Sequence, residues 1–244
     1  MDALAYHSLR DLQDRHWWFV GRRTIIEQLI RRFVKLPKSS RILEAGCGYG
    51  GNLAMLGKFG DLDAFEYDDE ARAHASKLSA LPVKKGYLPD HLGFDNDRFE
   101  LIAMLDVLEH VEDDAGSLRA LRTRLTDDGS LLVTVPAIPW LWSEHDEVHH
   151  HKRRYTKAAL QKLLKESGFE LVSTGYFNTL LFPLALLQRM AARLLRIPHR
   201  VETLPQRHVN SLLSRIFGME SHLVGRISAP VGLSLYAVAR QTRF

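Results

Sequence analysis

The segment from residue 41 to residue 50 carries the residue types and spacing that point most directly to chemistry. Its first five residues, Arg-Ile-Leu-Glu-Ala, fit a buried strand, and glycines follow at positions 46, 48 and 50. Glycines at alternate positions let the chain turn sharply and bring a ligand against bare backbone, facing the N-terminus of the next helix. This loop predicts a nucleotide-like ligand, held by Glu44, Gly46, Cys47, Gly48, Tyr49, Gly50 and Asn52.

Glycine spacing alone leaves two ligand classes open. Gly46, Gly48 and Gly51 also satisfy the dinucleotide fingerprint G-x-G-x-x-G, and Glu66 lies 20 residues after the first of them. The discriminating residue is Glu44, because a carboxylate at this position would repel a diphosphate. It suits instead a ligand that carries an ammonium and a sulfonium, and S-adenosylmethionine is such a ligand.

Four segments in order resemble the class I S-adenosylmethionine-dependent methyltransferases: residues 43–50, 64–67, 99–102 and 105–111, within a resemblance that covers roughly residues 40 to 177. The resemblance implies that Glu66 accepts both ribose hydroxyls, that Tyr67 packs on adenine, and that Leu105 and Asp106 complete the cofactor site. One departure is Gly86-Tyr87-Leu88, where the family often has Gly-Asp to bind the adenine amino group. We therefore expect adenine recognition to depend on backbone groups.

Strand and helix patterns alternate along this region. We expect strands at 41–45, 61–66, 83–86, 99–105, 130–135 and 169–177, and helices from about residue 51, from Asp68, from Asp113 and over 156–167. Alternation of this kind predicts an α/β fold, a Rossmann-like and mostly parallel seven-stranded sheet with helices on both faces. The resemblance places the last strand, Gly232 to Arg240, antiparallel at the far edge of the sheet.

The chain divides into four predicted parts. Residues 1–36 form a helical cap of two helices around Trp17, Trp18 and Phe19, and residues 37–177 form the cofactor-binding core. Residues 178–229 form a helical insertion where the plain fold needs only a short loop, and residues 230–244 hold the last core strand and the C-terminus. Cys47 is the only cysteine, so no internal disulfide forms.

A first cluster of titratable side chains follows the fourth expected strand. Asp106, Glu109 and His110 stand at i, i+3 and i+4, which places them on one face of a helical turn. The segment resembles that of ubiquinone-pathway O-methyltransferases, some of which use a divalent metal. We expect His110 and Asp106 to be catalytic, with His110 near the transferred methyl; the alternatives are a divalent-metal site of all three residues, or a structural cap on the next helix.

A second cluster lies between residues 142 and 155, after the fifth expected strand. We expect it to cover the cleft and bind the substrate, with His150 as a second candidate base. The spacing does not fit a structural zinc site, and the alternative reading is a loop pinned by contacts from Asp146 to arginine. The predicted substrate-binding residues are His145, Asp146, His149, Arg153, Arg154 and Tyr155.

The positive charge gathers near the C-terminus. Residues 171–244 hold nine arginines, no lysine and two glutamates, which favours an anionic partner or simply a basic surface. In residues 178–200, Arg189, Arg193 and Arg196 form a stripe beside leucines, so this segment is a membrane-contact helix, a lid or a homodimer surface. No basic platform interleaved with aromatics is present, so we expect no nucleic-acid partner.

The longest wholly apolar run has eight residues, far short of the roughly 20 needed to span a bilayer, and no apolar signal stretch opens the chain. We expect a cytoplasmic protein, with peripheral attachment to the inner face of the membrane as an option. The expected function is transfer of the methyl group of S-adenosylmethionine to an oxygen of a small, lipid-linked or glycan acceptor, ahead of a nitrogen or carbon. The rivals are a nicotinamide-dependent oxidoreductase and a non-catalytic adenosyl-binding protein.

Overall fold

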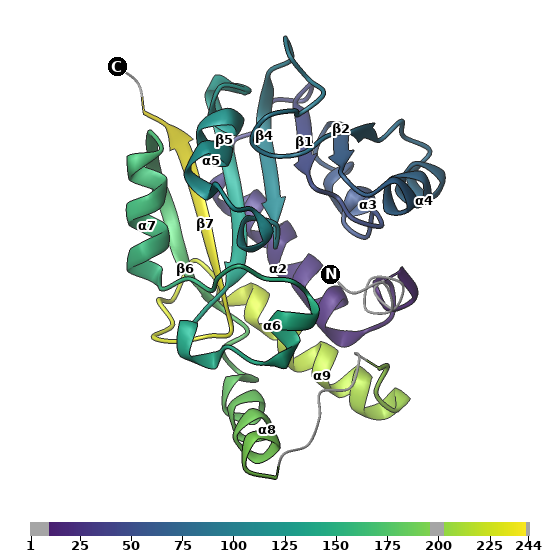
Figure 1. Cartoon of the computed structure of the whole chain (residues 1–244), viewed down its shortest axis with the longest axis vertical. Helices are drawn as coiled ribbons and strands as arrows, with labels where there is room; N and C mark the ends of the chain where they lie inside the picture. Colours follow the sequence, from purple (N-terminus) through teal and green to yellow (C-terminus); the bar gives the residue numbers. More distant parts are fainter. Residues whose placement is uncertain (1–9, 196–202, 243–244) are drawn as a thin grey trace.

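The computed structural model describes residues 10–195 and 203–242 of the 244-residue chain. Its centre is one seven-stranded sheet with helices on both faces (Figure 1). The strands are β1 (Arg41–Ala45), β2 (Asp61–Glu66), β3 (Lys84–Lys85), β4 (Phe99–Leu105), β5 (Leu125–Pro136), β6 (Phe169–Phe177) and β7 (Ser234–Gln241). The helices are α2 (Trp17–Phe33), α3 (Leu53–Leu56), α4 (Asp69–Ser79), α5 (Asp114–Arg122), α6 (Glu144–Val148), α7 (Lys157–Glu166), α8 (Phe182–Leu195) and α9 (Arg207–Met219).

The strand order is β3-β2-β1-β4-β5-β7-β6, and β1 to β5 run parallel to one another. The predicted Rossmann-like fold is therefore confirmed. The placement of the last strand at the edge was wrong, because β7 lies between β5 and β6 and is antiparallel to both. The burial of the two strands explains the order: six successive residues of β7 are buried, whereas β6 alternates between buried and exposed positions, which suits an edge strand.

Two hydrophobic cores lie on opposite faces of the sheet. Successive residues of a strand point to opposite faces, so β4 contributes Ile102 to one core and Leu101 to the other. The first core contains Leu118 of α5 and Leu160 of α7, and the second contains residues of α2 and α9. The sheet is thus fixed from both sides, and the carboxyl ends of its parallel strands stay free for a ligand.

The N-terminal and insertion helices pack against each other across the second core. The backbone N–H of Trp17 donates to Oδ1 of Asn210 at 2.9 Å, and the rings of Trp17 and Phe217 meet edge to face at 5.7 Å. The insertion therefore consists of α8, which lies below the strand ends in Figure 1, and α9, which returns to α2. Most of the first predicted N-terminal helix falls in residues 1–9, outside the described residues.

Several element boundaries differ from those expected. The helix predicted from residue 51 is the single turn α3, and β5 begins at Leu125, where it pairs with Phe99 ahead of an irregularity in register. The helices expected from Asp68 and Asp113 are confirmed, and both aspartates accept a hydrogen bond from a backbone N–H of the first turn. Within the described residues, no helix is both long and apolar enough to cross a membrane.

Candidate functional site

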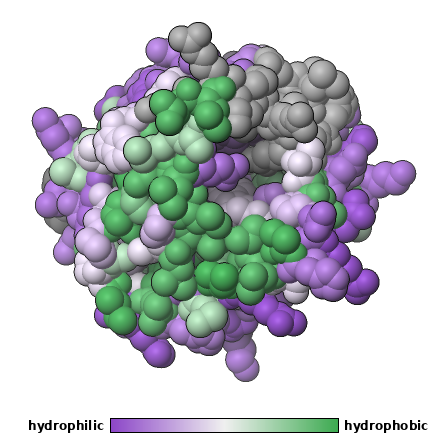
Figure 2. Space-filling view, turned by 90° about the horizontal axis from the view of Figure 1, so that it is seen from below, coloured by the Kyte–Doolittle hydropathy of each residue, from purple (hydrophilic) through white to green (hydrophobic). Residues whose placement is uncertain are grey.

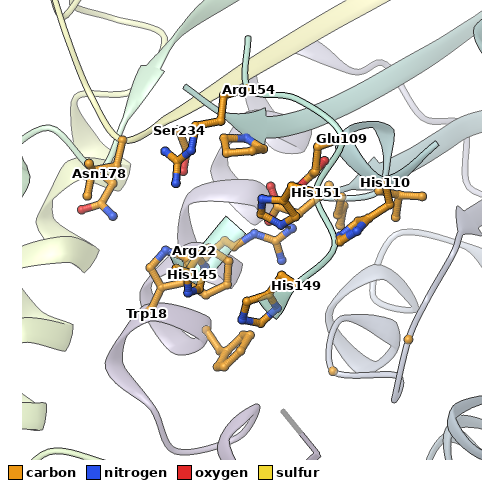
Figure 3. A pocket seen from close by; sticks show the side chains of 18 of the residues that line it. Trp18, Arg22, Glu109, His110, His145, His149, His151, Arg154, Asn178 and Ser234 are labelled. Carbon is orange, nitrogen blue, oxygen red and sulfur yellow. Dashed lines mark ion pairs between the residues drawn. The ribbon is translucent and has the colours of Figure 1, made fainter. Parts of the chain in front are cut away.

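A cavity of about 1640 Å³ opens at the carboxyl ends of the parallel strands. It is bordered by the glycine loop after β1, by the N-terminal part of α2, by the short 3₁₀ helix η1 (Leu108–His110) after β4, by the segment around α6, and by part of the insertion. Figure 3 shows side chains of α2, of η1 and of the segment around α6 facing one space. Ligands of open α/β sheets bind at this edge, so the cavity is the candidate functional site.

The glycine loop gives the cavity a wall of bare backbone. Gly46, Gly48 and Gly50 all have positive φ, at 72°, 54° and 87°, a backbone conformation that residues other than glycine rarely adopt. A Cβ added at Gly48 would meet no atom within 4 Å, so the space above this residue is open. A ligand can therefore approach the main chain of the loop closely.

Glu44 lies buried beneath the loop with an unused hydrogen-bonding atom. Its Oε1 accepts from Nδ2 of Asn52 at 2.8 Å, while Oε2 has no hydrogen-bonding partner. Burial raises the pKa of Glu44 to about 7, against the opposing effects of Asn52 and of the nearby Arg22 charge. An unpartnered buried carboxylate oxygen is costly, and a cationic ligand group would stabilise it.

Glu66 ends β2 and borders the cavity beside two tyrosines. One of its oxygens accepts from the N–H of Gly48 at 2.8 Å and the other from the N–H of Asp68 at 2.9 Å, and burial raises its pKa. The Tyr67 side chain is 68% exposed, and its ring lies 6.4 Å from that of Tyr87. The backbone N–H and carbonyl of Tyr87 both bond to His91, so they are already used within the protein.

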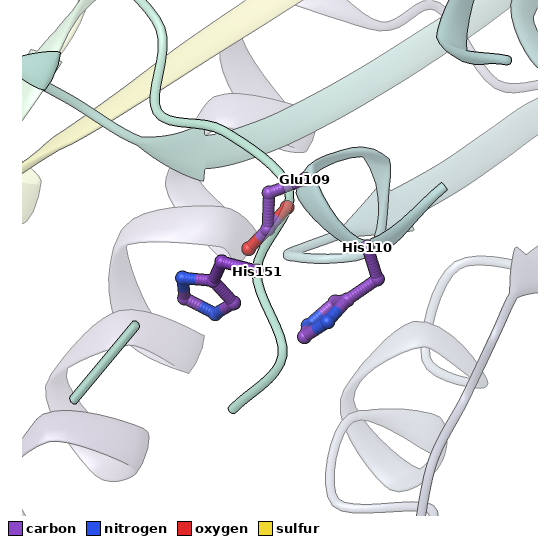
Figure 4. A group of neighbouring side chains, drawn as sticks. All are labelled: Glu109, His110 and His151. Carbon is purple, nitrogen blue, oxygen red and sulfur yellow. The ribbon is translucent and has the colours of Figure 1, made fainter. Parts of the chain in front are cut away.

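Asp106 is held by the N-terminal helix α2. It has a positive φ of 56°, its Oδ2 lies 2.5 Å from Nη2 of Arg22, and its Oδ1 accepts from the Thr134 hydroxyl at 3.2 Å. The expected helical face of Asp106, Glu109 and His110 does not form, because the segment is a 3₁₀ turn preceded by this left-handed residue. Among the described residues, the side chains close enough together to share a metal ion are Glu109, His110 and His151 (Figure 4), and Asp106 is not one of them.

His110 lies among other histidines at one end of the cavity. Its ring centroid is 4.8 Å from that of His151, and the rings of His145 and His149 lie 4.2 Å apart. Burial, and then the charges of His151 and His149, lower the pKa of His110 to about 3. The His110 imidazole is therefore neutral at neutral pH, and a ring nitrogen can accept a proton or bind an ion.

Asp146 is a buried anchor of the second cluster. Its carboxylate accepts from Nδ1 of His151 at 2.9 Å, from Nε of Arg154 at 2.7 Å and from the N–H of Ser143 at 2.9 Å. Burial raises the pKa of Asp146, but the hydrogen bonds from His151 and Arg154 outweigh it and bring the pKa below its ordinary range. Asp146 does not border the cavity, and its contacts are those of the pinned-loop alternative rather than of a substrate ligand.

Two further members of the second cluster bind α5 instead of facing the cavity. Arg153 Nη1 lies 2.8 Å from Asp114 Oδ2, and the Tyr155 hydroxyl donates to the same carboxylate at 2.9 Å. His150 is exposed, has a positive φ of 52° and does not border the cavity, so it is not placed to act as the second base. None of these three residues lines the cavity, and the side chains of Arg153 and Tyr155 tie the loop to α5.

The remaining predicted residues do come together. The residues predicted from sequence that line the cavity are Gly46, Cys47, Gly48, Tyr49, Asn52, Glu66, Tyr67, Leu105, Asp106, His110, His145, His149 and Arg154. Glu44 and Gly50 are buried behind the loop. The lining residues lie up to 108 positions apart in the chain, from Gly46 to Arg154, and the parallel order of β1, β2, β4 and β5 gathers them at one edge of the sheet.

Sequence reasoning did not identify three other residues of the cavity. Arg22 is buried on α2, His151 was read only as part of a histidine run, and Asn178 follows β6 with an unpartnered buried Oδ1. The sequence spacing could have pointed to Arg22, because it lies one helical turn after Trp18. In the structure its guanidinium is 5.1 Å from the centroid of the Trp18 ring. Asn178 had no such signal, since it follows an edge strand by one residue.

The fold and the glycine loop define a class I S-adenosylmethionine-dependent methyltransferase. In agreement, the sequence profile of the methyltransferase domain family matches residues 18–174, so the chain belongs to this family. Two Mycobacterium tuberculosis proteins, named as probable S-adenosylmethionine-dependent methyltransferases, are each 26% identical over 178 residues, which are 70% of this chain. The matched region spans 62% of the length of each relative.

Solved structures share the fold at low sequence identity. A Haloferax volcanii methyltransferase, solved in complex with the Trm112 activator, superposes with a TM-score of 0.63 at 16% identity, covering 100% of this chain and 96% of that one. A Bacillus halodurans methyltransferase gives 0.59 at 16% identity and covers 89% and 99%. A Haemonchus contortus N-methyltransferase, in complex with phosphomonomethylethanolamine and S-adenosylhomocysteine, gives 0.60 at 13% identity and covers 90% and 52%.

The buried Asp146 generates a stability prediction. Asp146→Ala leaves the buried Arg154 guanidinium without its carboxylate, so we expect the free energy of unfolding to fall by about 3–5 kcal/mol in urea denaturation at pH 7. Glu147→Ala, an exposed neighbour on the same helix, should change it by less than about 0.5 kcal/mol. Because the folded-state pKa of Asp146 is lowered, its contribution is present above the ordinary aspartate pKa and is lost as the pH falls below it. Equal effects of the two substitutions would contradict an anchoring role.

Proposed function

We propose that the protein transfers the methyl group of S-adenosylmethionine to an oxygen atom of a small or lipid-linked acceptor. The observation that carries the proposal is the unpartnered Oε2 of Glu44 under an open glycine loop, with Glu66 at the same crevice. These groups suit a ligand with a cationic amino-acid end and a ribose. The nicotinamide alternative is disfavoured, since a diphosphate would sit beside Glu44.

The cofactor end of the cavity has a group for each part of the ligand. Glu44 and the backbone of the glycine loop would hold the amino-acid end, and Glu66 would exchange its bonds to backbone N–H groups for bonds to the ribose hydroxyls. Tyr67 and Tyr87 offer flat apolar faces for adenine. Since the Tyr87 backbone groups bond to His91, adenine selectivity rests on stacking more than on that residue's backbone.

The histidine end of the cavity would hold the acceptor. When bound, the cofactor supplies an electrophilic methyl group on a positively charged sulfur. The protein's part is to align an acceptor oxygen with that methyl and to accept the acceptor's proton. His110 is neutral but, with a pKa near 3, is a weak base, so an acceptor hydroxyl that loses its proton readily fits best. His145 and His149 border the same space.

A lipid-linked acceptor is favoured by the insertion. Leu184, Met190 and Leu213 of the insertion line the cavity, and Met190 is also 59% exposed at the surface. The neighbouring Leu187, which does not line the cavity, is 65% exposed. Figure 2 shows apolar side chains gathered on this face around a hollow. A continuous apolar path from the surface into the cavity would let a lipid chain enter while its head group reaches the histidines.

The arginine stripe gives less support to membrane contact than the sequence predicted. Nη1 of Arg189 donates to the carbonyl of Leu141 at 2.8 Å, which ties α8 to the segment before α6. Arg196 and the Arg193 side chain lie outside the described residues. The proposal of membrane contact through residues 178–200 therefore rests on the exposed apolar residues of α8, with a lid and a homodimer contact as the competing roles.

The proposed cofactor site is tested by calorimetry. Glu66→Ala should weaken S-adenosylhomocysteine binding about 10- to 100-fold, as expected for the loss of charged hydrogen bonds to the ribose. Asp61→Ala, at the exposed other end of the same strand, should leave the affinity unchanged. If Glu66→Ala binds as tightly as the native protein, Glu66 does not hold the ribose. Tighter binding of a nicotinamide dinucleotide to the native protein would refute the class of function.

Membrane contact is tested by co-sedimentation with phosphatidylcholine vesicles that contain phosphatidylglycerol. The native protein should pellet with the vesicles. Leu187→Glu should lower the partition coefficient about tenfold or more, because it removes a leucine that would insert into the membrane and adds a charge that anionic lipids repel. Leu78→Glu, at an exposed leucine of α4, is the matched control and should have no effect. If the native protein stays in solution while Leu187→Glu breaks a dimer, α8 is a subunit contact.

A further inference from the structure

The cavity extends past the histidines to the ends of β6 and β7, where two polar side chains border it. Asn178 follows the last residue of β6, and Ser234 is the first residue of β7. The strand register pairs Phe177 with Ser234. The N–H of Leu233 donates to the carbonyl of Asn178 at 3.3 Å, so the two polar residues are close neighbours. Figure 3 shows both of them on the side of the cavity away from His110.

The Asn178 side chain has an unused hydrogen-bonding atom. The residue is 1% exposed, and its Oδ1 has no hydrogen-bonding partner. An amide oxygen that is buried without a donor costs free energy, and a ligand group with an O–H would remove that cost. Since Asn178 lines the cavity, a bound acceptor is the nearest source of such a group.

Surrounding contacts hold Asn178 in this position. Its φ is 57°, a left-handed conformation that asparagine adopts more readily than most residues do. The hydroxyl of Thr179 donates to the carbonyl of Val231 at 2.8 Å. Oε1 of Glu220 accepts from the N–H of Leu180 at 2.7 Å. The turn that carries the amide is thus tied to the loop before β7 and to the end of the insertion, so little ordering is needed when a ligand binds.

The cation beside this corner is already paired, so the corner does not select an anion. Nε of Arg154 donates to Oδ1 of Asp146 at 2.7 Å, and its Nη1 donates to the carbonyl of Ala137 at 3.1 Å. The apolar residues of the cavity wall next to Asn178 and Ser234 are Pro136, Leu181 and Leu233. A neutral hydroxyl group on an apolar surface therefore suits the corner better than a phosphate or a carboxylate does.

The distance of the corner from the end of β4 sets the length of the acceptor. The strand order runs β4-β5-β7-β6, and neighbouring strands lie about 4.8 Å apart, so β7 and β6 lie about 10 and 14 Å from β4. A pocket for one small ligand typically has about 300–1,000 Å³, so the cavity of about 1640 Å³ has room for a donor and an extended acceptor. An acceptor with one oxygen over β4 must therefore be at least about 10 Å long to reach Asn178.

We propose that Asn178 and Ser234 form a second subsite for the acceptor, which binds a hydroxyl group about 10 Å from the oxygen that receives the methyl group. Oδ1 of Asn178 would accept the hydrogen bond from this hydroxyl, and the Ser234 hydroxyl would bond to its oxygen or to a neighbouring one. The inference deepens the proposed function and rests on it, because the acceptor must share the cavity with S-adenosylmethionine. The acceptor class is a neutral molecule that carries hydroxyl groups at two separate places.

The test is calorimetry of the full chain with maltose, with n-octyl β-D-maltoside below its micelle concentration, and with an octyl oligo(ethylene glycol) methyl ether. The ether has hydrogen-bond acceptors but no O–H group. We expect the native protein to bind the maltoside more tightly than the ether. Asn178→Gly and Ser234→Ala should each weaken binding of the maltoside about 3- to 10-fold, as expected for one lost hydrogen bond, and leave binding of the ether unchanged.

The variants are chosen to separate recognition from folding. Glycine replaces Asn178 because it keeps the positive φ without strain. Asn96→Gly, at an exposed asparagine outside the cavity, is the matched control and should bind the maltoside as the native protein does. Circular dichroism establishes that each variant is folded. Equal affinity for maltose and the maltoside would assign the subsite to a free sugar, and tighter binding of the maltoside to a lipid-linked one.

Two results would overturn the inference. One is that the folded native protein binds the maltoside no more tightly than the ether. The other is that Asn178→Gly binds the maltoside as tightly as Asn96→Gly does, or loses the maltoside and the ether equally. S-adenosylhomocysteine binding is measured on the same samples, so a chain that binds this ligand but gives either result refutes the inference alone. A chain that shows the expected pattern with the maltoside but does not bind S-adenosylhomocysteine refutes only the proposed function.

Discussion

The buried cation of Arg22 is the constraint on which the cavity depends. It lies 2.5 Å from Asp106, and its charge also lowers the pKa of Glu44 and of Glu109, against the raising effect of burial on both. Without a compensating charge, three carboxylates this close to the core would be expensive to bury. Since Arg22 is on α2, the N-terminal helix is part of the site and not an accessory cap. The packing of α9 on α2 then ties the insertion to the same site.

The arrangement divides the cavity into two chemically different ends. At the β1 and β2 end, the backbone of the glycine loop and Glu66 line the cavity, and Glu44 lies buried beneath the loop with one unpartnered oxygen. These groups suit a cationic nucleoside. At the other end, His110 and His151 lie close to Glu109, and Asp146 holds His151 and Arg154 in place through hydrogen bonds. Asp106 lies between the two ends and is held there by Arg22. A methyl donor and its acceptor would thus meet over the end of β4, because β4 lies between β1 and β5 in the strand order of the sheet.

The sequence predicts the cofactor end better than the acceptor end for a physical reason. Glu66 is the last residue of β2, and the glycine loop and Asp106 directly follow β1 and β4. Parallel strands bring their carboxyl ends to one edge, so a strand pattern suffices to place these residues. His151 and Asn178 depend on loop geometry and on an insertion, which local patterns do not encode. The run of histidines does not indicate which of its members line the cavity. His150 and His151 are neighbours in sequence, but of these two only His151 lines it. The order of β7 and β6 could have been predicted from their residue patterns. The buried residues of β7 follow one another without interruption, as in a central strand, whereas buried and exposed positions alternate in β6, as in an edge strand.

The most direct measurement is the electron density of S-adenosylhomocysteine bound in a crystal of the protein. We expect its amino group at Glu44, its ribose hydroxyls at Glu66 and its sulfur facing Asp106 and the histidine end, because only this orientation directs the methyl of the donor toward the acceptor space. Density in which the ribose contacts neither carboxylate, or in which the sulfur faces away from His110, would contradict the division of the cavity into a donor end and an acceptor end.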